Sequence, residues 1–135
     1  MKHFASSRTQ FLSVKDVRAI VSQTGVAPTL QRMADYIHAD YVRWLDFDKC
    51  ARVASHSKDG VIELMPIADG RTYAFKYVNG HPKNHLFHLP TVMAFGVLAD
   101  VDTGIPLMLS ELTLTTALRT AAMSAVAARW SKSTR

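Results

Sequence analysis

Cysteine is almost absent from this sequence. Cys50 is the only one among 135 residues, so the chain holds no disulfide framework of its own. No apolar run approaches the roughly 18 residues that cross a membrane, and residues 1–8 lack the apolar core of a secretory signal. These absences predict a cytoplasmic protein with no membrane partner. Cys50 itself lies in an apolar run, which favours a small, buried hydrophobic side chain.

Glycine is also sparse, with six residues, and none of them forms a GxGxxG or P-loop pattern. Strand-like and helix-like segments do not alternate either, so the sequence predicts no dinucleotide-binding domain. The net charge is +5, but the basic residues are dispersed and no basic stripe carries interleaved aromatic rings. The charge therefore does not favour a nucleic-acid partner.

What the sequence does contain is the periodicity of one domain. A chain of 135 residues with 48% hydrophobic residues is long enough to bury a core. Helical spacing predicts one helix over 13–23, with Ser13 as its N-cap, and a longer helix over 29–46. A third helix is predicted from a cap at Ser110 to about residue 128.

Between the second and third helices the period changes to that of strands. Turn signals at Asp59-Gly60, Asp69-Gly70 and Asp102-Thr103-Gly104 indicate short connections, which favour antiparallel neighbours. The order of elements predicts an α+β fold with N-terminal helices, a mainly antiparallel or mixed sheet and a C-terminal helix. The predicted strands cover residues 50–55, 61–67, 71–79, 91–101 and 105–110, after a short first strand over 10–13.

Three charged residues interrupt apolar, strand-like runs: Arg52, Glu63 and Lys76. Side chains alternate between the two faces of a strand, so Lys76 shares one face with Ala74 and Val78 while aromatic rings take the other. Charged side chains are rarely buried without a partner. Together these residues predict a polar site on the sheet for a zwitterionic or anionic ligand.

Each charged residue has more than one interpretation. Lys76 is either a cation for a ligand carboxylate or a proton carrier, unless it reaches water from a strand edge. Arg52 suits bidentate binding of a carboxylate, or an ion pair with Glu63 inside the sheet. Glu63 in turn accepts a ligand ammonium group or is that same partner. Arg119 stands in an alanine- and threonine-rich helical stretch, where it either contacts a ligand or is simply solvated.

Three histidines, His81, His85 and His88, lie close together in the sequence. Imidazoles are good zinc ligands. However, the glycine and prolines around them indicate an irregular loop, and no acidic or thiolate ligand is fixed nearby. We therefore predict no metal site here, but an exposed loop beside the polar site.

Several linked segments of the chain resemble the ornithine cyclodeaminase/mu-crystallin family. The segment over 75–82, FKYVNGHP, carries Lys76 and is one of them. The resemblance runs from about residue 14 to 128, and the block over 48–82 is most similar to the bacterial members. Several motifs in the same order are more specific than any one of them. The segments are 52–55, 60–66, 75–82, 91–98, 110–113 and 116–122.

The resemblance implies that residues 14–128 are a substrate-binding and dimerisation domain. Residues 1–13 would then be an N-terminal extension and residues 129–135 a divergent tail. In the family, a separate Rossmann domain holds NAD, and the reaction converts L-ornithine to L-proline and ammonia. The expected ligand is L-ornithine or a similar amino acid, and the expected assembly is a homodimer joined through the sheets of two copies.

The resemblance also implies roles at the matching positions. Arg52, Lys76 and Arg119 would grip the substrate carboxylate, and Glu63 would face the side-chain ammonium group. Thr91 would lie near the nicotinamide, and Arg119 would be close to both ligands. The family's catalytic aspartate belongs to the Rossmann domain, so no catalytic residue is expected within this chain.

The sequence departs from the family at its C-terminus. It stops at Arg135, where the family continues into a glycine-rich NAD fold. This predicts a truncated or split enzyme that is inactive on its own, with a second chain as the carrier of the NAD domain. Two other functions remain open: a non-catalytic ligand-binding or dimerisation module, and part of a related amino-acid or imine dehydrogenase.

Overall fold

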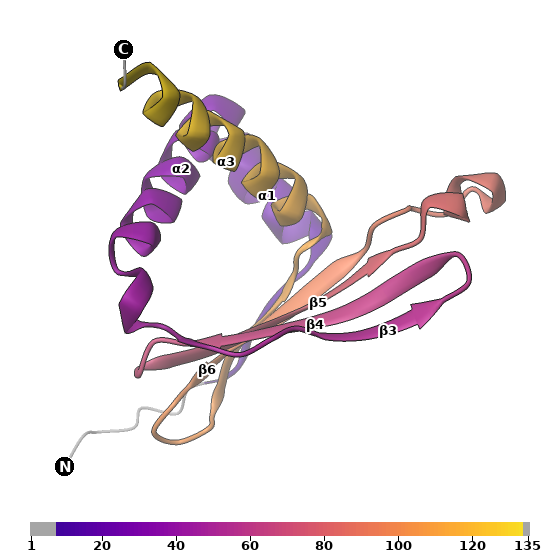
Figure 1. The fold of residues 1–135 in the computed structure, drawn as a ribbon, viewed down its shortest axis with the longest axis horizontal. Coiled ribbons are helices and arrows are strands. Elements are labelled where there is room, and N and C mark those ends of the chain that lie inside the picture. The colour runs from indigo at the N-terminus through magenta and orange to yellow at the C-terminus, as the bar shows by residue number, and fades with distance from the viewer. Residues whose placement is uncertain (1–7, 134–135) are drawn as a thin grey trace.

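The computed structural model describes residues 8–133, which form a seven-stranded sheet with helices on one side of it (Figure 1). The strand order is β1-β7-β6-β5-β4-β2, and β3 also pairs with β4. β1 runs parallel to β7, whereas the other pairs are antiparallel. The predicted α+β fold with a mixed sheet is therefore confirmed. The strands are β1 (Gln10–Leu12), β2 (Asp48–Lys49), β3 (Val53–Ser57), β4 (Gly60–Ala68), β5 (Thr72–Gly80), β6 (Ala94–Asp100) and β7 (Pro106–Glu111).

The first helix, α1 (Val14–Thr24), begins as the sequence predicts. The Ser13 side chain accepts a hydrogen bond from the Asp16 amide, and the Asp16 carboxylate accepts one from the Ser13 amide, which is a capping box. Gly25, at a φ of 86°, ends this helix and starts the next. Glycine takes such a conformation at little cost.

The second helix, α2 (Val26–Val42), starts earlier and ends earlier than predicted. Pro28 was expected to lie outside the helix, but it belongs to the first turn, where main-chain amides have no partner within the helix. After Val42 the chain tightens into a short 3₁₀ turn, η1 (Trp44–Asp46), before it enters the sheet.

The predicted strand over 50–55 is wrong in its bounds, because two short strands share one edge of β4. Lys49 pairs with Ile67 and Val53 pairs with Leu64, so the gap falls opposite Met65 and Pro66. Proline has no N–H to donate to a ladder. Residues 50–52 therefore lie outside the strands, and Cys50 is exposed, not buried.

The third helix, α3 (Thr113–Ser133), also starts later than predicted. Ser110 is not its N-cap but a buried residue of β7. Glu111 takes the capping role instead, because its Oε1 accepts a hydrogen bond from the Leu114 amide at 2.8 Å.

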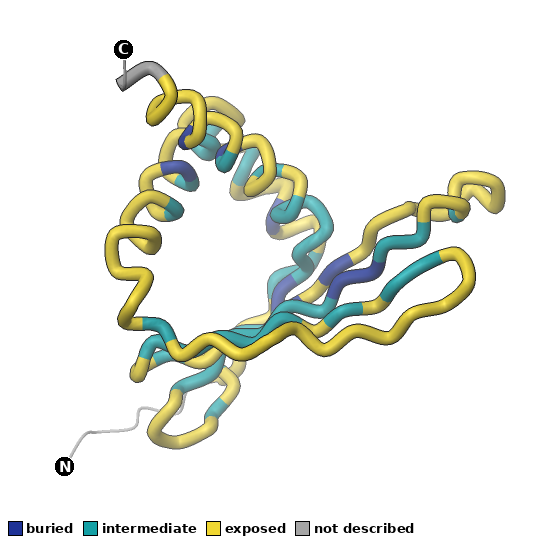
Figure 2. The backbone as a smooth tube through the Cα atoms, viewed as in Figure 1, coloured by how far each residue is buried: buried dark blue, intermediate teal, exposed yellow. Residues whose placement is uncertain are grey.

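The core lies where α2 crosses α3 (Figure 2). Ala34 and Ala122 are fully buried there, and such small residues let the two helices approach closely. Among the described residues no large side chain is completely buried. Much of the apolar surface of the sheet therefore remains available to partners.

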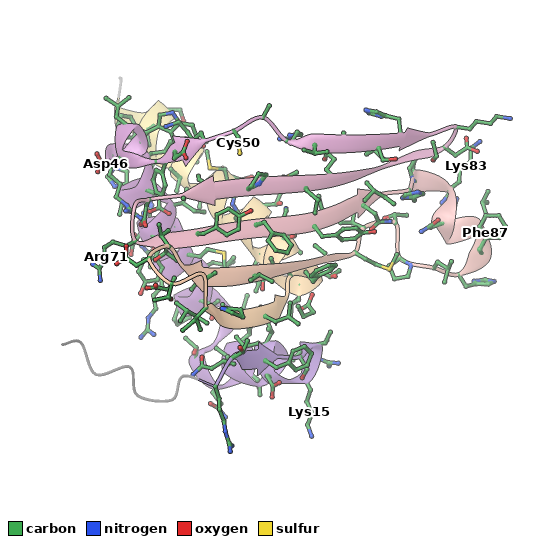
Figure 3. The ribbon with its side chains drawn as sticks, turned by 90° about the horizontal axis from the view of Figure 1, so that it is seen from below. Lys15, Asp46, Cys50, Arg71, Lys83 and Phe87 are labelled. Carbon is green, nitrogen blue, oxygen red and sulfur yellow. The ribbon has the colours of Figure 1, made fainter. Side chains whose placement is uncertain are left out.

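The two faces of the sheet differ in chemistry. One face points to the helices, since Ala74 and Leu98 line a hollow together with residues of α2; we call it the helix-facing side. The opposite face, which we call the open face, has no helix over it (Figure 3). On the open face Phe95 stacks on Tyr77 at 4.9 Å between ring centroids and meets Phe75 edge-on at 6.4 Å.

Candidate functional site

Lys76 occupies the middle of β5, opposite Met65 of β4 and Gly96 of β6. Its side chain shares the helix-facing side with Ala74, as predicted from alternation. Burial lowers the pKa of the Lys76 ammonium, and the nearby charges of Arg119 and then Arg52 lower that pKa further. The Glu63 carboxylate acts in the opposite direction. The structure thus brings together the four predicted residues Arg52, Lys76, Arg119 and Glu63, which we call the charged cluster.

Glu63 enters the cluster from β4, where it stands opposite Val78 and Ala54. Its carboxylate pairs with Arg52, whose Nη1 lies 3.1 Å from Oε1 and 3.3 Å from Oε2. The ion pair that the sequence left open is therefore present. Arg52 approaches from the irregular segment before β3, and its side chain is 59% exposed, against 19% for Glu63.

Arg119 reaches the cluster from α3. It is exposed, and it lines a hollow of about 540 Å³ between α2, α3 and the helix-facing side. The start of α3 is fixed on β6, because the Leu112 amide donates to the Ala94 carbonyl and the Ala94 amide donates to the Thr113 hydroxyl. The position of Arg119 relative to Lys76 is set by these contacts.

Gly96 contributes to this arrangement although sequence reasoning missed it. A Cβ atom at Gly96 would lie 2.5 Å from Leu112 Cδ1 and 2.7 Å from the Phe75 carbonyl oxygen. Glycine at this position allows the Phe75 main chain and the Leu112 side chain, just before α3, to lie this close to the strand that pairs with Lys76. An isolated glycine within a strand pattern was the signal that could have indicated this close approach.

A second charged network closes one end of the hollow. Arg43, at the end of α2, pairs with Asp40 at 3.1 Å and with Asp69 in the β4–β5 turn at 2.9 Å. Asp69 also accepts hydrogen bonds from the main-chain amides of Thr72 and Arg71. These bonds, with that of Thr72 the strongest, lower the pKa of Asp69 to about 2. The network ties α2 to the sheet.

Thr91 does not belong to the charged cluster. It was predicted to lie within a strand, but β6 begins only at Ala94. The Thr91 carbonyl accepts a hydrogen bond from the His81 amide, five residues beyond Lys76 along the chain. At roughly 3.3 Å per residue, that places Thr91 about 16 Å from Lys76 along the sheet.

Two of the three histidines, His81 and His85, contact different polar groups. His81 Nδ1 lies 3.0 Å from Asn79 Nδ2, and His85 Nδ1 lies 2.6 Å from the Pro82 carbonyl oxygen. Within residues 8–133 no group of three histidine, cysteine or acidic side chains is placed to hold a metal ion.

The described residues do not form a site that could hold NAD on their own. Residues 8–133 contain one parallel strand pair, β1 with β7, and no glycine-rich turn between a parallel strand and a helix that would cradle a pyrophosphate. Thr91 and Arg119, to which the resemblance assigns contacts with the cofactor, are polar residues whose side chains suit such contacts.

Comparisons with known proteins agree with this fold. Residues 14–135 match the model of the ornithine cyclodeaminase/mu-crystallin family. The chain is 58% identical over 120 residues to the ornithine cyclodeaminase of Agrobacterium fabrum, which covers 89% of this chain and 34% of that protein.

Two solved structures show the same arrangement of helices and strands. A lysine cyclodeaminase, studied for its recognition of L-lysine, L-ornithine and L-2,4-diaminobutyric acid, is similar with a TM-score of 0.82 and 31% identity, over 90% of this chain and 38% of that one. An archaeal alanine dehydrogenase dimer with bound NAD is similar with a TM-score of 0.69 and 27% identity, over 85% of this chain and 34% of that one.

The α+β fold is therefore one that this chain shares with these enzymes. The chain belongs to the ornithine cyclodeaminase/mu-crystallin family. It spans about a third of the length of the curated relatives it matches. Within the described part of the chain, no helix is both long and apolar enough to cross a membrane.

Proposed function

We propose that this chain is the substrate-binding domain of an ornithine cyclodeaminase-type enzyme, whose reaction converts L-ornithine to L-proline and ammonia with NAD. The observation that carries the proposal is the convergence of Arg52 and Arg119 on the half-buried Lys76, beside the Glu63 carboxylate. The identity of 58% to a curated ornithine cyclodeaminase supports the choice of substrate.

In this proposal the three cations bind the substrate carboxylate. Arginine side chains bind carboxylates through two parallel N–H donors, and Lys76 adds a compact charge from the sheet. Bringing three cations together is unfavourable: burial is the main cause of the lowered pKa of Lys76, and the charges of Arg119 and Arg52 lower that pKa further. A bound carboxylate relieves that repulsion, so the site favours anionic ligands.

Glu63 gives the proposal its preference for a diamino acid. In the structure Glu63 is paired with Arg52. When the substrate carboxylate takes Arg52, Glu63 becomes the acceptor for the side-chain ammonium group of ornithine. One internal ion pair is thereby replaced by two ion pairs with the ligand, whereas a ligand without the second ammonium would leave Glu63 unmatched.

We further propose a homodimer that buries the open face of the sheet. Apolar side chains there are substantially exposed, including Ile62 at 38%, Leu64 at 41% and Phe95 at 43%. Contiguous apolar surface of this kind marks an interaction site. Sedimentation velocity tests this: a dimer is expected, with dissociation on Phe95→Glu, whereas an unchanged monomer for both proteins would contradict the proposal.

A second candidate is the corresponding domain of an amino-acid dehydrogenase. The Arg52–Glu63 ion pair favours it, because Glu63 then needs no ligand ammonium group. The similar fold of the alanine dehydrogenase agrees with this candidate. A non-catalytic binding module is the third candidate, because the charged cluster can hold a ligand without any chemical step.

A chimeric enzyme separates the candidates. Residues 14–128 would replace the matching part of the Agrobacterium fabrum ornithine cyclodeaminase, and proline formation from L-ornithine would be measured with NAD. Turnover within tenfold of the parent enzyme supports the proposal. Turnover of L-alanine but not of L-ornithine supports the dehydrogenase. A folded chimera that binds ornithine without turning over either amino acid supports the binding module.

A further inference from the structure

The end of β5 holds a buried side-chain amide, that of Asn79, which lies outside the charged cluster. Asn79 is 5% exposed, and both polar atoms of its side chain are used. Its Oδ1 accepts a hydrogen bond from the Met93 amide at 2.5 Å, and its Nδ2 lies 3.0 Å from His81 Nδ1. A buried polar side chain with both ends satisfied in this way fixes the groups around it.

The partners define the orientation of this amide. The Met93 N–H is a donor, so it must face the Asn79 oxygen, and the nitrogen of the amide must then face His81. His81 accepts at Nδ1, which places the ring proton of its neutral form on Nε2. The ring of His81 is itself confined, because a Cβ atom on Gly60 would overlap it.

Asn79 acts at the point where the β5–β6 pairing ends. The last paired residues are Val78 and Ala94. Beyond them the main-chain N–H of Asn79 donates to the Met93 carbonyl. The side-chain oxygen of Asn79 accepts a hydrogen bond from the main-chain N–H of Met93. Both main-chain groups of Met93 are thus held by one residue.

The contacts of Asn79 also extend to the segment that contains Thr91. The His81 amide donates to the Thr91 carbonyl at 2.9 Å, and Asn79 holds both the ring of His81 and the main chain of Met93. Residues 91–93 therefore follow β5 although they form no strand. We propose that Asn79 is a positioning residue that fixes the 91–93 segment and, through it, the place where Thr91 meets the cofactor; the cofactor part rests on the proposed function.

Substitutions of Asn79 remove different parts of this arrangement. Aspartate keeps an acceptor for Met93 but has no N–H for His81, and alanine has neither. Glutamine is one methylene longer and would move one of the two bonds. The pair Asn79→Asp and Asn79→Ala therefore separates the two contacts.

Amide hydrogen exchange of the 135-residue chain, followed by NMR, tests the positioning directly. The Met93 amide is expected to be protected in the parent protein, to lose at least tenfold protection in Asn79→Ala and to keep it in Asn79→Asp. Asn84→Ala is the matched control, because the Asn84 side chain donates to the Pro90 carbonyl in the same loop. It should leave Met93 within threefold of the parent.

The amides of β6 report on the fold of each variant. Unchanged Met93 protection in Asn79→Ala overturns the proposal. If Asn79→Ala loses protection throughout β6, the test rests on Asn79→Asp. Persistent protection of the Met93 amide in Asn79→Asp supports the proposal. Loss of Met93 protection in Asn79→Asp, while the β6 amides stay protected, overturns the proposal.

The chimera described above tests the cofactor part by NAD affinity and not by turnover. Asn79→Ala is expected to weaken NAD binding about tenfold, with ornithine binding changed less than threefold and Asn84→Ala close to the parent. Equal loss of both ligands, or no loss of NAD affinity, overturns the cofactor part. A chimera that binds NAD but does not convert ornithine contradicts the proposed function, while the NAD affinities still decide the role of Asn79.

Discussion

Arg52 Nη1 lies 3.1 Å from Glu63 Oε1, so the two charged side chains to which the resemblance assigns opposite ends of a ligand form an ion pair with each other. The pair is open to solvent on the Arg52 side, with 59% of that side chain exposed. Solvent-exposed ion pairs contribute only about 0–1 kcal/mol to folding. Exchanging this contact for contacts with a ligand is therefore inexpensive.

Glu63→Gln should change ligand preference more than it changes stability. The variant keeps the size of the side chain but removes the charge that meets a second ammonium group. In the chimera we expect ornithine affinity to fall about tenfold, and the affinity for L-norvaline, which has no side-chain amine, to stay within threefold. Calorimetry with both ligands measures this. An equal loss for both ligands would assign Glu63 to folding alone.

Lys76→Met should stabilise the domain at neutral pH. Because the pKa of Lys76 is lowered in the folded chain, the folded state binds fewer protons there than the unfolded state, and stability rises with pH up to the ordinary value of 10.5. The advantage of the methionine variant should therefore be largest near pH 7 and shrink as pH rises past the lowered pKa. Thermal melts of both proteins between pH 6 and 10.5 measure it. A pH-independent difference would show that only packing has changed.

Asp69→Asn should remove an acid-sensitive contribution to stability. The folded pKa of Asp69 is about 2, against 3.8 in the unfolded chain, so its contribution is present above pH 3.8 and is lost as pH falls to about 2. We expect the variant to be about 1 kcal/mol less stable at pH 6, with the difference gone near pH 2. Urea unfolding at several pH values measures it, and Asp59→Asn, which loses the exposed ion pair with Lys83, is the control.

Gly96→Ala should destabilise the domain by about 1–3 kcal/mol, because the added methyl group overlaps Leu112 and the Phe75 carbonyl. Gly80→Ala is the matched control in the neighbouring strand. There the added Cβ would lie 3.5 Å from Val61 Cγ1, an ordinary contact. Chemical unfolding of both variants compares them. Equal stability of the two variants would contradict the close seating of α3 on β6.

Periodicity predicted the centre of the sheet well. β4 and β5 are long strands with regular alternation, so Glu63 and Lys76 were placed on the correct elements. Ser13 was recognised as a cap because its capping partner is local. Predictions from local pattern are therefore correct at these positions, although the local cap signal at Ser110 was wrong.

The errors come from contacts between distant segments. Cys50 lies in an apolar run that resembles a strand, but its place beside Pro66 of β4 leaves it outside the pairing. The sequence pattern placed Thr91 in a strand. The segment that contains Thr91 instead depends on the side chain of Asn79, twelve residues earlier, and local pattern does not reveal that contact. The approach of Arg119 to Lys76 depends on where α3 begins, which Gly96 and Leu112 decide.

The most direct test of the charged cluster is the turnover of L-ornithine by the chimera with Lys76→Ala. Lys83→Ala is the control, because Lys83 pairs with Asp59 at the far end of the sheet. We predict that Lys76→Ala lowers kcat/KM at least a thousandfold while the fold is kept, and that Lys83→Ala stays within threefold of the unmutated chimera. Near-normal kinetics for Lys76→Ala would remove Lys76 from the site and contradict the account.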